Sequence, residues 1–305
     1  MLNKFLIILS LSIFMACASV SPVSSEKEEP QIFPSVENIV PGWQPFAAGV
    51  SFFHGETENP KLEFWALRVD LASPDVRVIV KGGAENRGRA NHETLSVKVP
   101  SFVRDNNLIA GINAVPFDIA SSREGRPVMN AGLVIAGGEV IAAANPRYDA
   151  IVFYKDSYKE KDAVKIISQS AINETDNIEN AAGAFHHILV KGEPAQRTLN
   201  RESRYQRSAA GISQDNRYLY LAVIDSACAV TQRKRGSTEK ETALLLRSLG
   251  CWDALNLDGG GSSALALRYP DGKIRLANTP SHNGIPGRER AVAGCIGVFS
   301  LSMEK

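Results

Sequence analysis

The sequence predicts an α+β protein, built on a mixed, largely antiparallel sheet with few helices. Short runs of apolar or alternating residues, typical of strands, recur from Lys61 to Leu301. Helical spacing is clear in only two stretches, 94–106 and 238–249. One strand–helix–strand crossover, over residues 218–257, precedes an Asp-Gly-Gly-Gly-Ser-Ser turn and is the reason for expecting a mixed sheet.

The N-terminus is predicted to be an export signal. Lys4 supplies a positive charge, and the apolar run Phe5–Met15 is too short to span a membrane. Ala16-Cys17 resembles the lipobox of bacterial lipoproteins, and the alternative is a secretory signal with an incidental cysteine. We therefore expect a signal peptide over 1–17 with lipid-modified Cys17, a tether over 18–45 and a single domain over 46–305.

This interpretation predicts an exported lipoprotein at a bacterial cell envelope, facing the periplasm or the cell surface. Its only membrane attachment would be the lipid at Cys17. After cleavage, Cys228, Cys251 and Cys295 remain, so at most one disulfide can form. The preferred interpretation is that all three are small buried hydrophobic residues.

The first elements of the domain are strands. Lys61–Leu71 alternates between apolar and polar residues, and Asp75–Lys81 follows a Ser-Pro turn, which predicts a hairpin or meander. Thr94–Asn106 is expected to be a helix that Pro100 limits, and Leu108–Ala114 a short buried strand. Further strands are expected at Gly132–Ala136, Glu139–Ala143, Ala150–Tyr154, Val164–Gln169 and His187–Lys191.

The second half contains the crossover. Tyr218–Ile224 is a strongly apolar strand, and Thr238–Leu249 is the clearest helix. Thr238 and Glu241 have the spacing of a capping box, and Gly250 is a suitable helix stop. The remaining strands are expected at Asp253–Leu257, Ala264–Leu267, Ile274–Ala277 and Ala293–Leu301.

Composition excludes several classes of protein. Of 305 residues, 44% are hydrophobic and 22% are charged, which is inconsistent with a wholly disordered chain. The net charge of +1 gives no overall field that would collect nucleic acid, so no nucleic-acid partner is expected.

The segment Asn256–Ser263 is the strongest functional signal. A buried strand runs into Asp258, then into Gly259, Gly260 and Gly261, then into Ser262 and Ser263. Consecutive glycines allow a sharp turn whose N–H groups can bind an anion, with the serines as further donors. The alternative is a solvated turn capped by the aspartate. Because the segment ends a buried strand, we favour a site.

Four other positions join this turn as candidates. Asn113 can orient a sugar hydroxyl or the scissile oxygen, although a buried amide that holds a turn is the alternative. Asp118 can act as an acid, a base or a ligand. Arg207 can bind a phosphate in a bidentate manner, or can belong to a surface ion pair. Asp225 ends an apolar strand, where sites collect.

Metal-binding and cofactor patterns are not evident. The five histidines show neither HxxxH nor HExxH spacing, and the cysteines form no CxxC pair, so no zinc site is predicted. The sequence requires no cofactor. Bound Ca²⁺ or Mg²⁺ at the carboxylates is left open, without a loop pattern to support it.

Several of these segments, in this order, resemble the phosphodiester glycosidase family over about residues 60–302. The most specific part is Ala254–Leu265, which follows the predicted helix. Arg207–Ile212 resembles the family's Arg-Thr-Ala-Ile-Gly, and Val223–Ser226 resembles its strand ending in Asp-Gly. Glu289–Val292 corresponds to the family's Glu-Arg-x-Val, which brings in Arg290. Asn113–Phe117 departs from the family's Asn-Gly-Gly-Phe-Phe, which indicates a reshaped pocket.

The resemblance implies hydrolysis of a sugar-1-phosphodiester, which releases the sugar and leaves a phosphomonoester. Our leading hypothesis is that the substrate belongs to an envelope or host-derived glycan. The resemblance also assigns Arg207, Arg290 and the 259–263 turn to the phosphate. Asp258 and Asp225 would then activate water or stabilise an oxocarbenium-like centre. One alternative is a non-catalytic envelope protein that binds an anionic glycan. Another is a hydrolase whose substrate contains no phosphate, such as one that trims peptidoglycan.

Overall fold

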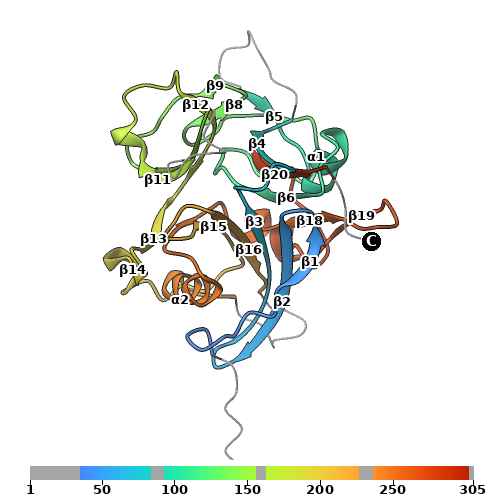
Figure 1. Ribbon diagram of the computed structural model, residues 1–305. Coiled ribbons are helices and arrows are strands. Elements are labelled where there is room, and N and C mark those ends of the chain that lie inside the picture. Colours follow the sequence, from blue (N-terminus) through green and yellow to red (C-terminus); the bar gives the residue numbers. More distant parts are fainter. Residues whose placement is uncertain (1–34, 84–92, 156–162, 227–235, 302–305) are drawn as a thin grey trace, which may run out of the picture. The chain divides into compact units, whose positions relative to one another are not determined.

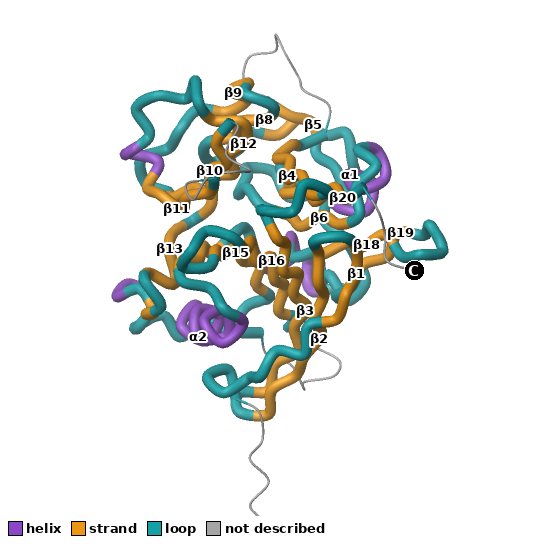
Figure 2. Tube along the Cα trace, viewed as in Figure 1, coloured by secondary structure: helices purple, strands orange, loops and turns teal. Residues whose placement is uncertain are grey.

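A computed structural model describes residues 35–83, 93–155, 163–226 and 236–301 (Figure 1). The predicted signal peptide with Cys17, and Cys228, lie outside these described residues. Strands dominate the described part, which contains only two α-helices, so the expectation of few helices is confirmed (Figure 2).

The largest sheet has eight strands in the order β1-β2-β3-β16-β15-β17-β13-β14. Their bounds are β1 Gln44–Ala47, β2 Val50–Glu58, β3 Lys61–Asp70, β13 His186–Val190, β14 Glu193–Pro194, β15 Arg207–Ile212, β16 Tyr218–Ile224 and β17 Asp253–Asn256. We call this the main sheet.

The described residues also form two five-stranded sheets and one two-stranded sheet. Their strand orders are β11-β10-β12-β8-β9, β19-β18-β6-β20-β4 and β5-β7. The bounds are β4 Val76–Lys81, β5 Thr94–Leu95, β6 Ala110–Asn113, β7 Pro127–Val128, β8 Val134–Ala136, β9 Glu139–Ala142, β10 Asp149–Tyr154, β11 Val164–Ser168, β12 Ile178–Ala184, β18 Leu265–Arg268, β19 Ile274–Leu276 and β20 Cys295–Ser300.

The expectation of one mixed sheet is wrong. Every pairing between named strands in the described residues is antiparallel, and the strands divide among several sheets. Strands β16 and β17 do run in the same direction, but β15 lies between them and pairs antiparallel with both. The inserted strand comes from earlier in the chain, which local patterning does not reveal.

The expected hairpin between Lys61–Leu71 and Asp75–Lys81 is also wrong. Strand β3 pairs instead with β2 and β16, whereas β4 pairs with β20 in another sheet. A one-sided polar pattern was expected for β3, but most of its side chains are buried because both faces of the main sheet are covered.

Two helices are attached to these sheets. Helix α1 spans Val99–Asp105, and it starts later than expected because Pro100 is tolerated only in a first turn. Helix α2 spans Glu239–Leu249 with the predicted capping box at Thr238 and Glu241. It ends at Gly250, whose φ of 113° suits glycine in the left-handed region.

The main sheet has an apolar core on each face. On one face, Leu245 and Leu246 of α2 belong to a buried cluster with Phe64 of β3. On the other, Leu67 of β3 lies in a cluster that includes Ile112 of β6. Alternation along β3 therefore serves two cores, and it fixes the position of α2 against the sheet.

The folded part begins earlier than the expected boundary at 46. Val36 is 4% exposed, and its carbonyl accepts a hydrogen bond of 2.7 Å from the Ser248 hydroxyl of α2. Residues 35–45, which we expected to be tether, therefore include contacts with the core.

The cysteines in the described residues follow the sequence prediction. Cys251 and Cys295 are free and buried, and burial raises the pKa of both thiols. No helix in the described residues is both long and apolar enough to cross a membrane.

Removing the cap of α2 tests how this helix is held. In Thr238→Ala, the N–H of Glu241 loses its 3.1 Å bond to the Thr238 hydroxyl, and we expect a loss of about 1 kcal/mol in the free energy of unfolding. Urea denaturation measures it, with exposed Lys240→Ala as the control. Equal stability of both variants with the wild type would show that the capping box contributes nothing.

Candidate active site

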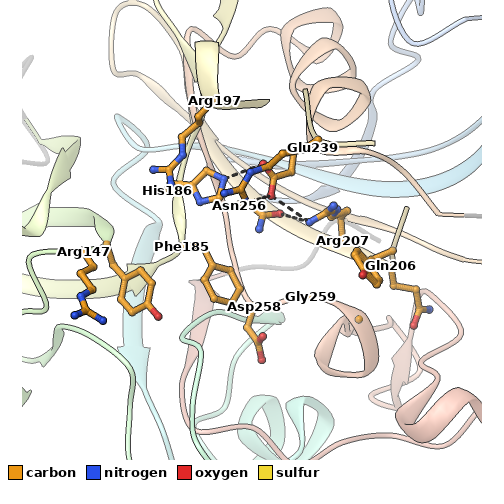
Figure 3. Close-up of a pocket in the computed structure, with 14 residues that line it drawn as sticks. Arg147, Phe185, His186, Arg197, Gln206, Arg207, Glu239, Asn256, Asp258 and Gly259 are labelled. Carbon is orange, nitrogen blue, oxygen red and sulfur yellow. Dashed lines mark hydrogen bonds and ion pairs between the residues drawn. The ribbon is translucent and has the colours of Figure 1, made fainter. Parts of the chain in front are cut away.

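A pocket of about 420 Å³ lies where β13, β15 and β17 of the main sheet meet the start of α2 (Figure 3). Arginine and aromatic side chains dominate its lining, together with two carboxylates. The lining residues are Arg147, Tyr148, Phe185, His186, Arg197, Arg201, Tyr205, Gln206, Arg207, Glu239, Asn256, Asp258, Gly259 and Gly260. Of the predicted site residues, Arg207, Asp258, Gly259 and Gly260 therefore belong to this lining, and Asn113 does not.

Asn113 supports the glycine turn. Its side-chain nitrogen donates to the Asp258 carbonyl at 2.6 Å, and its side-chain oxygen accepts from the Ser208 hydroxyl at 2.7 Å and the Ala264 N–H at 3.1 Å. The residue is fully buried at the end of β6. This geometry matches the alternative interpretation of Asn113, a buried amide that holds a turn, and it leaves no polar atom for a substrate.

The glycine turn offers fewer free donors than the sequence suggested. The N–H groups of Gly260, Ser262 and Ser263 donate to protein carbonyls, those of Gln206, Gly259 and Gly260 respectively. The Ser263 hydroxyl is buried without a partner in the described residues and lies outside the pocket lining. The turn therefore positions Asp258 more than it forms an anion-binding nest.

Asp258 is half-buried and belongs to the pocket lining (Figure 3). Burial raises the pKa of its carboxyl group to about 6, against the lowering effects of the Ser262 hydroxyl, the Arg290 charge and the Gly259 N–H. At pH 7.5 this group is mostly ionised, and it can accept a proton under mildly acidic to neutral conditions.

Arg290 holds the turn from outside the lining. Its Nη1 donates to the Ser262 hydroxyl at 3.1 Å, and its Nε donates to Nδ1 of His282 at 3.1 Å. His282 must therefore be neutral at Nδ1, and burial and the charges of Arg290 and Arg288 lower its pKa. A side chain at Gly261 would place Cβ 2.6 Å from the Arg290 guanidinium, so glycine is needed for this close approach.

Arg207 is a buried cation of the pocket wall. It is 7% exposed, and it donates to the carbonyls of Ser237 at 3.2 Å and Ser203 at 3.1 Å. A third bond, of 3.4 Å, reaches Oδ1 of Asn256. Burial lowers its pKa, while the charge of Glu239 opposes this. Arg207 is therefore not part of a surface ion pair, which was the alternative considered from the sequence.

Glu239, the first residue of α2, was not among the predicted site residues. Its Oε2 lies 2.9 Å from Nε2 of His186, and its Oε1 lies 3.3 Å from Arg201 and 3.7 Å from Arg207. Burial alone would raise its pKa, but the hydrogen bond with His186 and the nearby positive charges lower it below its usual value. Glu239 is therefore ionised at neutral pH.

The sequence contained a signal for this network, but local patterns pointed elsewhere. Glu239 lies between the capping residues Thr238 and Glu241, and His186 directly precedes the strand expected at His187–Lys191. The arginine-rich segment before β15 has the composition of a surface, yet Arg197, Arg201 and Arg207 all line the pocket. Only the pairing of β13 and β15 with β17 shows that these residues share a wall.

Asp225 and Asp118 do not line the pocket. Asp225 is 3% exposed, and its oxygens accept hydrogen bonds from Gln206 at 3.1 Å, Asn278 at 2.9 Å and the Thr279 N–H at 2.8 Å. Asp118 is exposed and accepts from the Met129 N–H at 3.0 Å. Both carboxylates serve local structure, because chain topology, and not residue type, decides which strand ends reach the pocket.

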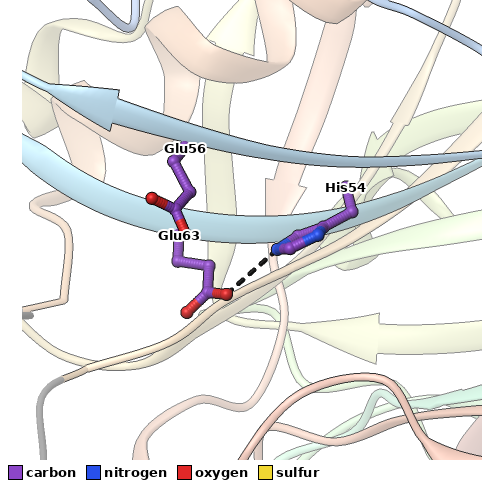
Figure 4. A group of neighbouring side chains, drawn as sticks. All are labelled: His54, Glu56 and Glu63. Atoms are coloured by element: carbon purple, nitrogen blue, oxygen red, sulfur yellow. Dashed lines mark hydrogen bonds and ion pairs between the residues drawn. The ribbon is translucent and has the colours of Figure 1, made fainter.

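One group with metal-binding side chains lies outside the pocket lining. His54 and Glu56 of β2 and Glu63 of β3 have ligand atoms within 4.8 Å of one another (Figure 4). The His54 ring stacks on Trp65 at 4.8 Å, and its Nε2 lies 3.0 Å from Glu63. No other such group occurs in the described ranges, so the pocket itself contains no evident metal-ligand set there.

The close approach of Arg290 to the turn can be tested by a double-mutant cycle. Gly261→Ala should destabilise the fold, and Arg290→Ala should relieve that penalty by at least about 0.5 kcal/mol because the clashing group is removed. Chemical denaturation of the four proteins measures this coupling.

Gly260→Ala provides the matched control. Its φ of 58° makes alanine unfavourable by roughly 1–2 kcal/mol, but a Cβ at this position would have no atom within 4 Å, so Arg290→Ala should leave this penalty unchanged. Equal coupling at both glycines would contradict the contact.

Comparison with known proteins identifies the family of the chain. Residues 106–299 match the model of the phosphodiester glycosidase family. No curated protein matches the sequence. Among solved structures, the chain is similar to the catalytic domain of zebrafish N-acetylglucosamine-1-phosphodiester alpha-N-acetylglucosaminidase, described as auto-inhibited by its pro-peptide. The TM-score is 0.59 and the identity 20%, over 88% of this chain and 87% of that one.

Two further structures share the fold. A hypothetical protein from Synechocystis has a TM-score of 0.57 and 13% identity over 83% of this chain and 62% of that one. A putative exported protein from Burkholderia pseudomallei has a TM-score of 0.53 and 14% identity over 78% and 74%. The family match confirms the resemblance carried by the sequence motifs, and the chain belongs to the phosphodiester glycosidase family.

Proposed function

We propose that the protein hydrolyses a sugar-1-phosphodiester in a cell-envelope or host-derived glycan, releasing the sugar and leaving a phosphomonoester. The observation that carries this proposal is the pocket itself, whose lining combines four arginines with two carboxylates whose pKa values shift in opposite directions. Family membership supports the reaction class.

The cationic wall suits the leaving group. The phosphate that departs from the sugar is anionic, so it needs charge stabilisation more than protonation. Arg207 is already held by two carbonyls and Asn256, which fixes its guanidinium before substrate arrives. Arg201, which is half exposed, shares Glu239 with it.

The two carboxylates would have different roles. Glu239 is engaged by His186, Arg201 and Arg207, so it orients the cationic wall and acts as a positioning residue. Asp258 forms no ion pair with any described residue, and it belongs to the pocket lining. It would activate the attacking water or stabilise positive charge at the anomeric carbon.

The remaining sequence-based expectations complete the proposal. Export and lipid attachment at Cys17 would place the enzyme at the cell envelope, next to carbohydrate substrates.

The proposed mechanism uses only side chains of the pocket. We therefore expect that treatment with EDTA leaves hydrolysis unchanged. A loss restored by added Ca²⁺ or Mg²⁺ would show instead that a metal takes part.

Asp258→Asn tests the proposed reaction. We expect hydrolysis of N-acetylglucosamine-1-phosphoglycerol to fall by about 10²- to 10⁴-fold, because the amide cannot accept a proton. Released sugar is measured over time, and circular dichroism verifies folding. Asp118→Asn, which removes an exposed carboxylate outside the pocket lining, is the matched control and should retain full activity.

The same experiment separates an enzyme from a binding protein. If the wild type binds the compound by calorimetry but releases no sugar over long incubation, the non-catalytic alternative is correct. Unchanged hydrolysis in Asp258→Asn would remove this residue from the mechanism. Hydrolysis of glycosides that contain no phosphate, at the same rate, would indicate another class of hydrolase.

The pH profile tests the state of Asp258. If its ionised form is active, kcat/KM should fall as the pH drops through about 6, the pKa of this carboxyl group. Because the charge of Arg290 lowers that pKa, Arg290→Gln should move the limb to higher pH. In the control Arg288→Gln, which removes a positive charge two residues away, the limb should stay at the same pH. A limb that does not respond to Arg290→Gln would assign the titration to another group.

A further inference from the structure

Two of the four pocket arginines have no charge partner among the described residues. Arg201 and Arg207 lie 3.3 and 3.7 Å from Glu239, whereas Arg147 and Arg197 form no ion pair with any described residue. Both unpaired side chains are exposed at the pocket. They come from separate elements, since Arg147 precedes β10 and Arg197 lies in the 3₁₀ helix Gln196–Thr198 after β14.

The acidic group near Arg197 is already engaged. Asp149 accepts hydrogen bonds from the His187 N–H at 2.8 Å and from its ring Nδ1 at 2.7 Å. Burial raises the Asp149 pKa, but these bonds and the charges of His187 and Arg197 lower it overall. The carboxylate therefore feels the field of Arg197 without forming an ion pair with it, and positive charge is left in excess at this end of the pocket.

An aromatic pair also lines the pocket. Tyr148 and Phe185 contact edge to face, with centroids 5.9 Å apart and planes at 78°. Figure 3 shows Arg147 on one side of Phe185, and Asp258 and Gly259 on the other. Aromatic faces suit an apolar part of a ligand, such as the carbon skeleton of a sugar or linker. The same figure shows Arg197 beside His186, on the side away from Arg207. The pocket thus has one cationic region at Arg207 and further positive charge at Arg147 and Arg197.

We propose that Arg147 and Arg197 form a second anion-binding subsite, which takes a further phosphate group on the aglycone of the substrate. The preferred substrate class is then a phosphodiester-linked glycan that carries more than one phosphate. Guanidinium groups bind phosphate oxygens in a bidentate manner, which favours phosphate as the ligand. The proposed reaction provides the assay for this subsite, so the inference rests on the proposed function.

Three compounds test the subsite. The first compound, N-acetylglucosamine-1-phosphoglycerol, has a single phosphate. The second carries an additional phosphomonoester at position 3 of the glycerol. In the third compound, a second glycerol is joined to the first through another phosphodiester, as in a repeating polymer. We expect kcat/KM for the wild type to be about tenfold higher with a second phosphate, mainly through a lower KM. A preference for the second or the third compound distinguishes a terminal phosphate from a repeating chain.

The variant Arg147→Gln/Arg197→Gln removes the two cations. It should abolish the preference for a second phosphate, so that kcat/KM falls more for the two-phosphate compounds than for the one-phosphate compound. The control Arg123→Gln/Lys273→Gln removes the same charge from exposed positions outside the pocket lining, and should keep the preference. Thermal unfolding verifies that both proteins are folded.

The opposing results are distinct. Equal kcat/KM for all three compounds in the wild type would overturn the subsite, as would an equal loss in both double variants. If no compound is hydrolysed, the proposed function fails, and calorimetric Kd values for the same compounds then decide the subsite. Tighter binding of the compounds with two phosphates, lost only in the Arg147/Arg197 variant, would still support it.

Discussion

The buried carboxylate of Glu239 is the contact on which the pocket depends. It begins α2, and its oxygens meet His186 of β13 and the guanidinium groups of Arg201 and Arg207. A buried negative charge is costly unless it is fully paired, and the N-terminal turn of a helix adds favourable dipoles. The charge therefore fixes α2, β13 and β15 relative to one another, and it does so at the wall where an anion would bind.

A second set of contacts joins the glycine turn to the neighbouring sheet. Asn113, at the end of β6, contacts the Asp258 carbonyl, the Ser208 hydroxyl and the Ala264 N–H. A single buried amide thus connects β6 with β15 and with both sides of the turn. Because its bonds are satisfied within the protein, the amide holds Asp258 in place without competing for substrate.

These two networks create different surroundings for two carboxylates in one pocket. Glu239 lies among positive charges and stays ionised, whereas burial raises the pKa of the Asp258 carboxyl group to about 6. Such a difference lets one group act as a fixed counter-charge while the other exchanges a proton. Arg147 and Arg197, which form no ion pair within the described part of the chain, add positive charge to the pocket lining, and this is the physical basis of the proposed second subsite.

Local sequence patterns determined the elements whose causes are local. The capping residues Thr238 and Glu241 marked the start of α2, and Gly250 marked its end, because caps depend only on neighbouring backbone groups. The strand that leads into Asp258 was likewise visible from its apolar run and the glycines after it. Arg207 was a candidate from its residue type and from a family motif, and the structure places it in the pocket lining.

Tertiary structure alone decided which strands pair and which side chains share the pocket. The insertion of β15 between β16 and β17 brings Arg207 beside Asn256, although these residues are far apart in sequence. The same topology sends Asp225 into a buried cluster of hydrogen bonds and leaves Glu239 facing the pocket. Carboxylates at strand ends look alike in a sequence, and only long-range packing sets the burial and the neighbouring charges that distinguish them.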